Sequence, residues 1–138
     1  MIKTKYFEIS NDSPTYFIAD ISANHDGSLD RAKKLIELAA KSGANAAKFQ
    51  NFKAEDIVSD FGFKKIGSFS HQSKWKKSVF ETYQSASLPW EWTEELKIEC
   101  DKYKIDFFST PYDLKAVDML NEYVDLFKIG SGDINYLD

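Results

Sequence analysis

Two lysines lie inside apolar segments of the sequence, and they are the first candidates for chemistry. Lys48 occurs in AAKFQ and Lys128 in FKIGSGD, each at the carboxyl end of a predicted strand. A charged ammonium among apolar side chains is costly unless a partner compensates it, and an anionic ligand would do so. Further donors that suit a phosphate occur at matching strand ends: Ser109, Thr110, Ser131 and the backbone amides of Gly130 and Gly132. This pattern predicts an anion-binding site.

Two carboxylates occupy comparable places in the sequence. Asp20 follows the apolar pair Ile18 and Ala19, so we expect it to be buried, where it could position a nucleophilic water or a developing cation. The alternative is that Asp20 simply neutralises Lys48. Asp133 follows GSG and could bind a substrate hydroxyl, or it could cap a helix or close a turn. The sequence leaves both pairs of alternatives open.

The sequence offers few metal ligands. His25 and His71 are the two histidines, both in predicted loops, whereas a catalytic zinc site normally takes three protein ligands. We therefore predict no metal site within this chain. His25, in ANHDG, is expected to shape a turn or orient a substrate, and Cys100 to pack as a small apolar side chain.

The elements that position these residues follow from an alternation of short apolar runs with helical periodicity, which is typical of βα units around a parallel sheet. We predict a helix over 29–40, with Ser28 as its N-cap and Gly43 in its terminal turn, and a later helix capped by Asp113. The predicted strands are 16–22, 44–50, 105–110 and 124–129.

The segment 51–88 is far longer than the usual βα loop of about 2 to 6 residues, and long loops often carry function. We predict a short helix over 78–83 within it, and Pro89 in the first turn of the next helix. The aromatic side chains of this segment and of the residues just after it are expected to pack in the core or in a lid, and one or two could stack on a sugar: Phe61, Phe63, Phe69, Trp75, Trp90 and Trp92.

Such repeats form either a doubly wound sheet or a TIM barrel. No phosphate-binding glycine fingerprint follows the first strand, and polar residues gather at the carboxyl ends of strands, where barrel enzymes keep their chemistry. A full barrel takes about 250 residues. We therefore expect residues 1–138 to be the N-terminal half of a (β/α)8 barrel and a fragment of a longer enzyme. If they were the whole chain, its open sheet edges should make it self-associate.

Composition narrows the class of protein. With 18 basic and 22 acidic residues the net charge is −4, which argues against a nucleic-acid partner. No apolar run approaches the roughly 20 residues that span a membrane, and the amino terminus lacks an apolar signal core. The single cysteine cannot form an internal disulfide. We expect a soluble cytoplasmic protein.

Four motifs, taken together, resemble the sialic acid synthases (N-acetylneuraminate synthases): YFIADISANHDG, ANAAKFQ, FFSTPYD and FKIGSGD. These enzymes condense phosphoenolpyruvate with an N-acyl mannosamine-type sugar. The resemblance implies a (β/α)8 barrel followed by an antifreeze-like domain, of which this chain holds only the first half of the barrel. It also implies a homodimer and a divalent metal, Mn or Mg, whose histidine ligands come from later strands.

The resemblance also assigns roles to residues. Lys48, Thr110, Lys128 and Ser131 match positions that hold phosphoenolpyruvate, and Gln50 matches one that contacts the sugar. Asp20 falls where the family usually has a glutamate that helps position water. Asp133 falls where an acidic residue orients the acceptor.

The acceptor sugar is expected to differ from that of the bacterial sialic acid enzymes. Their sugar-binding asparagine has no clear counterpart in the segment 72–75, which reads QSKW. A legionaminic, pseudaminic or other nonulosonate precursor is therefore the expected class of acceptor.

Two other readings remain open at this stage. A Schiff-base aldolase would use Lys48 or Lys128 as a neutral nucleophile. A non-catalytic half barrel would bind a phosphorylated metabolite without turning it over. Because half a barrel cannot supply the implied metal site, we expect this chain alone to lack condensing activity.

Overall fold

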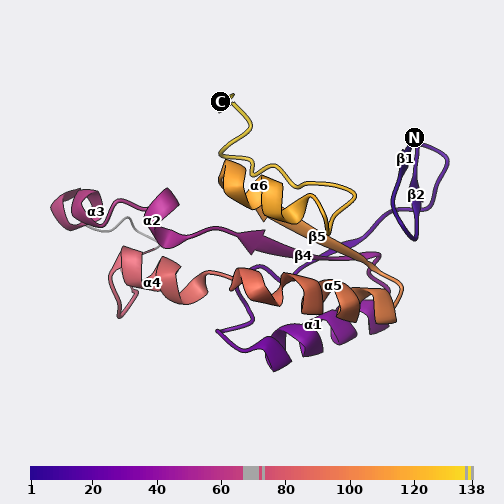
Figure 1. The fold of residues 1–138 in the computed structure, drawn as a ribbon, viewed down its shortest axis with the longest axis horizontal. Coiled ribbons are helices and arrows are strands. Elements are labelled where there is room, and N and C mark those ends of the chain that lie inside the picture. The colour runs from indigo at the N-terminus through magenta and orange to yellow at the C-terminus, as the bar shows by residue number, and fades with distance from the viewer. Residues whose placement is uncertain (67–71, 73, 136, 138) are drawn as a thin grey trace.

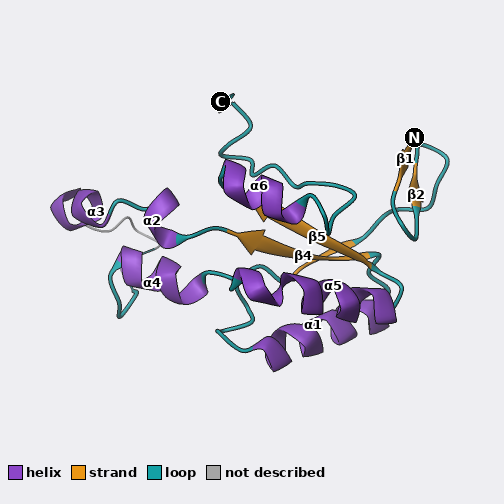
Figure 2. Ribbon diagram, in the orientation of Figure 1, coloured by secondary structure: helices purple, strands orange, loops and turns teal. Residues whose placement is uncertain are grey.

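A computed structural model gives the arrangement of the chain and describes residues 1–66, 72, 74–135 and 137. Within that part, a small N-terminal hairpin precedes a parallel sheet with its connecting helices (Figures 1 and 2). The bounds are β1 Ile2–Lys3, β2 Glu8–Ile9, β3 Ile18–Asp20, α1 Leu29–Lys41, β4 Ala46–Asn51, α2 Ala54–Ile57, α3 Asp60–Ile66, α4 Val79–Ala86, a 3-10 turn Trp90–Trp92, α5 Thr93–Lys102, β5 Asp106–Pro111 and α6 Leu114–Leu120.

The parallel sheet has the strand order β3-β4-β5, which follows the order of the sequence. In a doubly wound sheet the strand order reverses at a switch point, whereas in a barrel consecutive strands pair in sequence order. The predicted class of parallel α/β units is therefore confirmed, and the order within this sheet is that of a barrel.

The two faces of the sheet differ in character because successive side chains of a strand point to opposite sides. Ala47, Phe49 and Phe107 belong to the apolar core beneath the helices. Lys48 and Gln50, which alternate with them on β4, therefore point to the opposite face. Lys48 and Gln50, two of the candidate polar residues, thus share one face.

The core lies between the sheet and the helices. Helices α1 and α5 run side by side along the sheet (Figure 1), and Leu120 of α6 joins the same apolar cluster. The buried members of this cluster are Ile21, Ala32, Ile36, Ala47, Phe49, Leu88, Leu96, Cys100, Ile105, Phe107 and Leu120. Cys100 is fully buried, as expected, and burial raises the pKa of its thiol. It contributes to packing.

Helix ends follow the predicted caps. The Ser28 hydroxyl accepts a hydrogen bond from the Arg31 amide at 3.2 Å, and Gly43 takes a φ of +86° just after α1. The Asp113 carboxylate accepts a hydrogen bond from the Ala116 amide at 2.9 Å and caps α6. These local signals fixed α1 and α6 correctly.

The N-terminal hairpin lies at the amino end of the sheet, opposite α2, α3 and α4 (Figure 1). It was not predicted, because β1 and β2 are only two residues each. The Tyr16 hydroxyl donates to Asp106 at 2.6 Å, and the Phe7 ring meets the Tyr16 ring edge-on at 5.6 Å. The segment thus ties the amino terminus to the beginning of β5.

The predicted fourth strand, over residues 124–129, is wrong. Residues 124–129 form only one parallel bridge, Ser109 to Phe127, with the Lys128 amide donating to the Ser109 carbonyl at 3.0 Å. The apolar pattern indicated burial, but a strand also needs a ladder of backbone partners. This segment lies at the edge of the described sheet, and its ladder does not extend beyond the bridge.

The long segment after β4 contains α2, α3 and α4, so it is more regular than the loop we expected. The predicted helix over 78–83 is confirmed as Val79–Ala86, capped by Ser78. Phe61 and Phe63 lie on α3. Phe69 falls outside the described residues.

A matched pair of leucine substitutions tests the core assignment. Leu96 of α5 is fully buried, whereas Leu38 of α1 is 48% exposed. We expect Leu96→Ala to lower the free energy of unfolding by about 2 to 5 kcal/mol, and Leu38→Ala to change it by no more than about 0.5 kcal/mol. Urea unfolding followed by circular dichroism measures both, and equal losses would contradict the layer arrangement.

Candidate functional site

An ion pair links the first two strands at their carboxyl ends. Lys48 Nζ lies 2.9 Å from Asp20 Oδ2, and the parallel register places these two residues opposite each other. The Lys48 side chain is 12% exposed. Of the alternatives that the sequence left open, pairing of Lys48 with Asp20 is therefore present in this structure.

The expected burial of Asp20 is wrong. Asp20 is the last residue of β3, and its side chain is 60% exposed. The apolar neighbours in the sequence suggested an interior strand, but β3 is an edge strand of the described sheet, and Phe17 and Ile18 beside it are 62% and 44% exposed. Asp20 is thus an accessible carboxylate held beside a more buried ammonium.

The other residues predicted to hold an anion differ from one another in burial and in hydrogen-bond partners. Thr110 is 2% exposed and pairs in register with Gln50, on the face that carries Lys48. The Lys128 ammonium donates to the Ile129 carbonyl, and Ser131 lies in an exposed turn. Convergence of these side chains on one anion stays a prediction.

Ser109 does not belong to that face. It lies opposite Phe49 in the register, on the helix side of the sheet, and its hydroxyl donates to Asn51 at 2.5 Å. Its hydroxyl is buried in a structural role, so the expectation that Ser109 offers a donor to a phosphate is wrong. Strand alternation, applied to the correct starting residue, would have excluded it.

Asp133 closes the turn that follows Gly130. The Asp133 amide donates to the Gly130 carbonyl at 3.0 Å, and the Asp133 carboxylate folds back so closely that a Cβ on residue 130 would collide with it. Asp133 is therefore a turn residue, as one of the two alternatives had it. Its carboxylate also lines the cavities described next.

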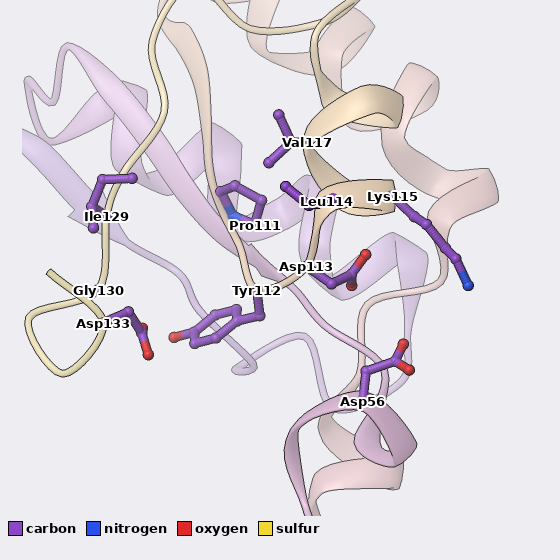
Figure 3. Close-up of a pocket in the computed structure, with 10 residues that line it drawn as sticks. All are labelled: Asp56, Pro111, Tyr112, Asp113, Leu114, Lys115, Val117, Ile129, Gly130 and Asp133. Atoms are coloured by element: carbon purple, nitrogen blue, oxygen red, sulfur yellow. The ribbon is translucent and has the colours of Figure 1, made fainter. Parts of the chain in front are cut away.

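Two adjoining cavities occupy the carboxyl end of the sheet, and both are lined by Asp56, Tyr112 and Asp133. The first has a volume of about 620 Å³ and extends along α6; Figure 3 shows the Tyr112 ring reaching toward Asp133 within it. The second has a volume of about 700 Å³ and is bounded by the long segment after β4. Its lining is Ala23, Gln50, Phe52, Asp56, Ile57, Trp75, Thr82, Tyr83, Ala86, Tyr112 and Asp133.

The second cavity brings together Gln50 and Asp133, both predicted from the sequence to contact a sugar. It has an aromatic wall, in which Phe52 contacts the rings of Tyr83 and Tyr112 at centroid distances of 5.7 and 5.8 Å. Of the aromatic residues named from the sequence, Trp75 lines this cavity. An amide, a carboxylate and aromatic rings form a suitable lining for a polyhydroxylated ligand with an apolar substituent.

Tyr112 is a site residue that the sequence reasoning missed. Its hydroxyl accepts a hydrogen bond from Gln50 Nε2 at 3.2 Å. Burial, with the nearby negative charge of Asp133, raises the pKa of Tyr112, while the Gln50 hydrogen bond acts in the opposite direction. The signal that could have found it is its place directly after the β5 strand, where Thr110 had already been singled out.

His25 has a structural place. It is fully buried, its Nδ1 accepts a hydrogen bond from the Gly27 amide at 3.1 Å, and its ring meets Trp92 edge-on at 5.8 Å. Burial lowers the pKa of His25, although the Ala86 backbone acts in the opposite direction. The predicted turn role is confirmed, and His25 does not line either cavity. His71 lies outside the described residues.

The described residues contain no group of three or more histidine, cysteine, aspartate or glutamate side chains that could hold a metal ion. The implied divalent metal thus finds no fitting site among them. In the same part of the chain, no helix is both long and apolar enough to cross a membrane.

Sequence comparison connects this chain to known proteins. The sequence model of the NeuB family matches residues 35–138. The chain is 42% identical over 127 residues to N,N'-diacetyllegionaminic acid synthase of Campylobacter jejuni, covering 89% of this chain and 37% of that protein. It is 32% identical over 128 residues to the N-acetylneuraminate-9-phosphate synthase of Homo sapiens, covering 92% and 35%. The chain thus spans little more than a third of the length of these relatives.

Solved structures share the fold. A sialic acid synthetase from Leptospira borgpetersenii, in complex with citrate, superposes with a TM-score of 0.77 at 28% identity, covering 99% of this chain and 43% of that one. The spore coat polysaccharide biosynthesis protein SpsE of Bacillus subtilis gives a TM-score of 0.67 at 36% identity, covering 95% and 35%. The parallel units described above are therefore part of the same α/β barrel architecture.

The buried histidine generates a pH prediction. Because burial lowers the pKa of His25 below its ordinary value of 6.5, the unfolded chain binds a proton at a higher pH than the folded one. The contribution of the neutral His25 side chain to the free energy of unfolding is complete above the ordinary pKa. It is lost as the pH falls toward the lowered pKa of the folded chain. We expect the free energy of unfolding to drop more between pH 7.5 and 5.5 in the unaltered chain than in His25→Asn.

Asparagine suits this comparison because its Oδ1 can still accept from the Gly27 amide, so the turn is retained. Urea unfolding at the two pH values measures the difference. Equal drops in the two proteins would show that His25 does not titrate between them.

Proposed function

Because the chain belongs to the NeuB family, we propose that it is the phosphoenolpyruvate- and sugar-binding part of an enzyme that condenses phosphoenolpyruvate with an N-acyl amino sugar. One observation carries the proposal. Gln50 lies near the end of β4 and Asp133 in the turn after Gly130, yet they line the same cavity. This cavity would receive the acceptor sugar, beside the face that carries Lys48.

The lysines would hold the donor substrate. Phosphoenolpyruvate has a phosphate and a carboxylate, both anionic throughout the reaction, and Lys48 with Lys128 would supply fixed positive charge. In this structure Asp20 is the partner of Lys48, and its exposed side chain can turn aside when an anion takes its place. The Lys128 ammonium donates to the backbone carbonyl of Ile129, and among the described residues no ion pair joins it to a carboxylate.

The reaction would proceed by carbon–carbon bond formation followed by loss of phosphate. The C3 carbon of phosphoenolpyruvate attacks the aldehyde carbon of the open-chain sugar, leaving a cationic C2. A water oxygen adds at C2, and one of its protons ends on the former aldehyde oxygen, which becomes a hydroxyl. The C2–O bond to phosphate then breaks, the new C2 hydroxyl gives its proton to the departing phosphate, and C2 becomes the ketone carbon of the product. Asp20, freed from Lys48, would orient that water, while Gln50 and Asp133 would hold the sugar for attack.

The relatives named above include synthases of two different acids, and the acceptor of this chain is proposed at the level of class, an N-acyl amino sugar. The divalent metal and the homodimer of a complete enzyme stay predictions, with metal ligands outside this chain. The steps above use this chain's own residues alone.

The ion pair of Lys48 disfavours Lys48 as the nucleophile of the aldolase alternative. A Schiff-base lysine attacks a carbonyl with the lone pair of a neutral amine, which an ammonium paired to Asp20 does not have. Treatment with a keto substrate and borohydride separates the two functions. A reduced adduct on Lys48 or Lys128 would contradict the proposed function.

A lysine substitution tests donor binding. We expect Lys128→Met to weaken phosphoenolpyruvate binding by about 1.5 to 3 kcal/mol, the scale of a charge-assisted hydrogen bond. Lys102→Met is the matched control, because Lys102 lies on α5 and pairs with Glu99 at 3.0 Å, on the helix layer. Isothermal titration calorimetry with phosphoenolpyruvate gives both dissociation constants.

The control should bind as the unaltered chain does. A folded Lys128→Met protein with an unchanged dissociation constant would remove Lys128 from the donor site. Failure of the unaltered chain to bind phosphoenolpyruvate would contradict the proposed donor.

A further inference from the structure

A chain of hydrogen bonds crosses the carboxyl ends of all three parallel strands described above. The Ser22 hydroxyl, just after β3, donates to Gln50 Oε1 at 2.5 Å. Gln50 Nε2, on β4, donates to the Tyr112 hydroxyl, just after β5, at 3.2 Å. Both ends of one amide are therefore held by hydroxyl groups from different strands.

These contacts hold both ends of the amide in place. In this structure the Ser22 hydroxyl donates to the carbonyl end and the Tyr112 hydroxyl accepts from the amino end. One of the two N–H groups on Nε2 is used by Tyr112, and the other is left for a ligand.

We propose that Ser22 and Tyr112 are positioning residues that hold the Gln50 side-chain amide in place across the strand ends, so that its free N–H donates to an oxygen of the acceptor sugar. The inference rests on the proposed function, and it adds two residues to which neither the comparisons nor the sequence motifs assign a role. Gln50 and Tyr112 line the second cavity, where Asp133 supplies the opposing acceptor. The matching ligand groups are an amide carbonyl or hydroxyl oxygen for the free Gln50 N–H and a hydroxyl proton for Asp133.

The backbone at Ser22 is an independent observation in favour of the proposal. Ser22 has a φ of +51°, in the left-handed region that a residue with a Cβ enters at a cost and glycine enters freely. The Ile21 and Ser22 amides both donate to the Lys48 carbonyl, at 2.9 and 3.0 Å, which holds this conformation. Strained residues cluster at active and binding sites, and here the strained residue places its hydroxyl on Gln50.

The experiment measures binding of N-acetylmannosamine, the probe sugar, by isothermal titration calorimetry with the 138-residue chain. We expect Ser22→Ala and Tyr112→Phe each to raise its dissociation constant about fivefold to tenfold, the scale of one hydrogen bond, and to leave that of phosphoenolpyruvate unchanged. In a Gln50→Leu background neither substitution should have a further effect, because both act through Gln50.

Tyr16→Phe is the matched control. It also removes a half-buried tyrosine hydroxyl, which donates to Asp106 at 2.6 Å, but at the amino end of the sheet. It is expected to lower the melting temperature and to leave sugar binding unchanged. Thermal unfolding of every variant shows whether it is folded under the conditions of the titration.

Nuclear magnetic resonance of the Gln50 side-chain amide separates the two proposals. We expect Ser22→Ala and Tyr112→Phe to shift its resonances and to speed the exchange of its protons with water, in the absence of any sugar. Unchanged resonances, or a loss of sugar affinity that persists in the Gln50→Leu background, would overturn the positioning role. If the unaltered chain binds no sugar, the proposed acceptor and the sugar contact both fail, whereas the amide resonances still decide whether Ser22 and Tyr112 hold Gln50.

Discussion

Hydrogen bonds from β4 to its two neighbours determine where every candidate side chain of the strands lies. The register sets Lys48 opposite Asp20 on β3, and Gln50 opposite Thr110 on β5. Since strand side chains alternate between faces, a slip of one residue would move these polar groups into the apolar layer under the helices. Phe49 is fully buried in that layer, and its transfer to the polar face would be costly. The apolar core therefore fixes the geometry of the polar face, although it contributes no group to it.

The end of β3 shows how this constraint reaches the site. The Lys48 carbonyl accepts from two successive amides, those of Ile21 and Ser22, so the chain must turn sharply there. The turn places Ser22 in a left-handed conformation and ends β3 at Asp20. As a consequence, the Asp20 carboxylate and the Ser22 hydroxyl lie on adjacent parts of β4, one at Lys48 and the other at Gln50. One local departure from the ladder thus serves two contacts.

The parts of the fold that could be predicted are those encoded by local pattern. Helix α1 and strands β4 and β5 follow from apolar periodicity and caps, because those signals act within a few residues. The burial of Asp20 was predicted wrongly, because a run of apolar neighbours reports nothing about whether a strand has partners on both sides. The same reason explains 124–129, whose one bridge to Ser109 depends on tertiary pairing. Tyr112 was missed because its role arises from a contact with Gln50, 62 residues earlier in the chain.

The charges of the site are separated in a way that bears on the two proposed substrates. Lys48 and Lys128 are cationic and lie outside the lining of the second cavity, whereas that lining includes the carboxylates of Asp56 and Asp133. An anionic donor would be repelled by two carboxylates and attracted to the lysines, while a neutral sugar can use the carboxylates as hydrogen-bond acceptors without an electrostatic cost. Phosphoenolpyruvate bound in the second cavity would also compete with its acidic side chains for the hydrogen-bond donors of Gln50 and Tyr112. The charges therefore favour a different position for each of the two proposed substrates at one end of the sheet. This preference comes from charge alone and does not depend on the shape of the cavity.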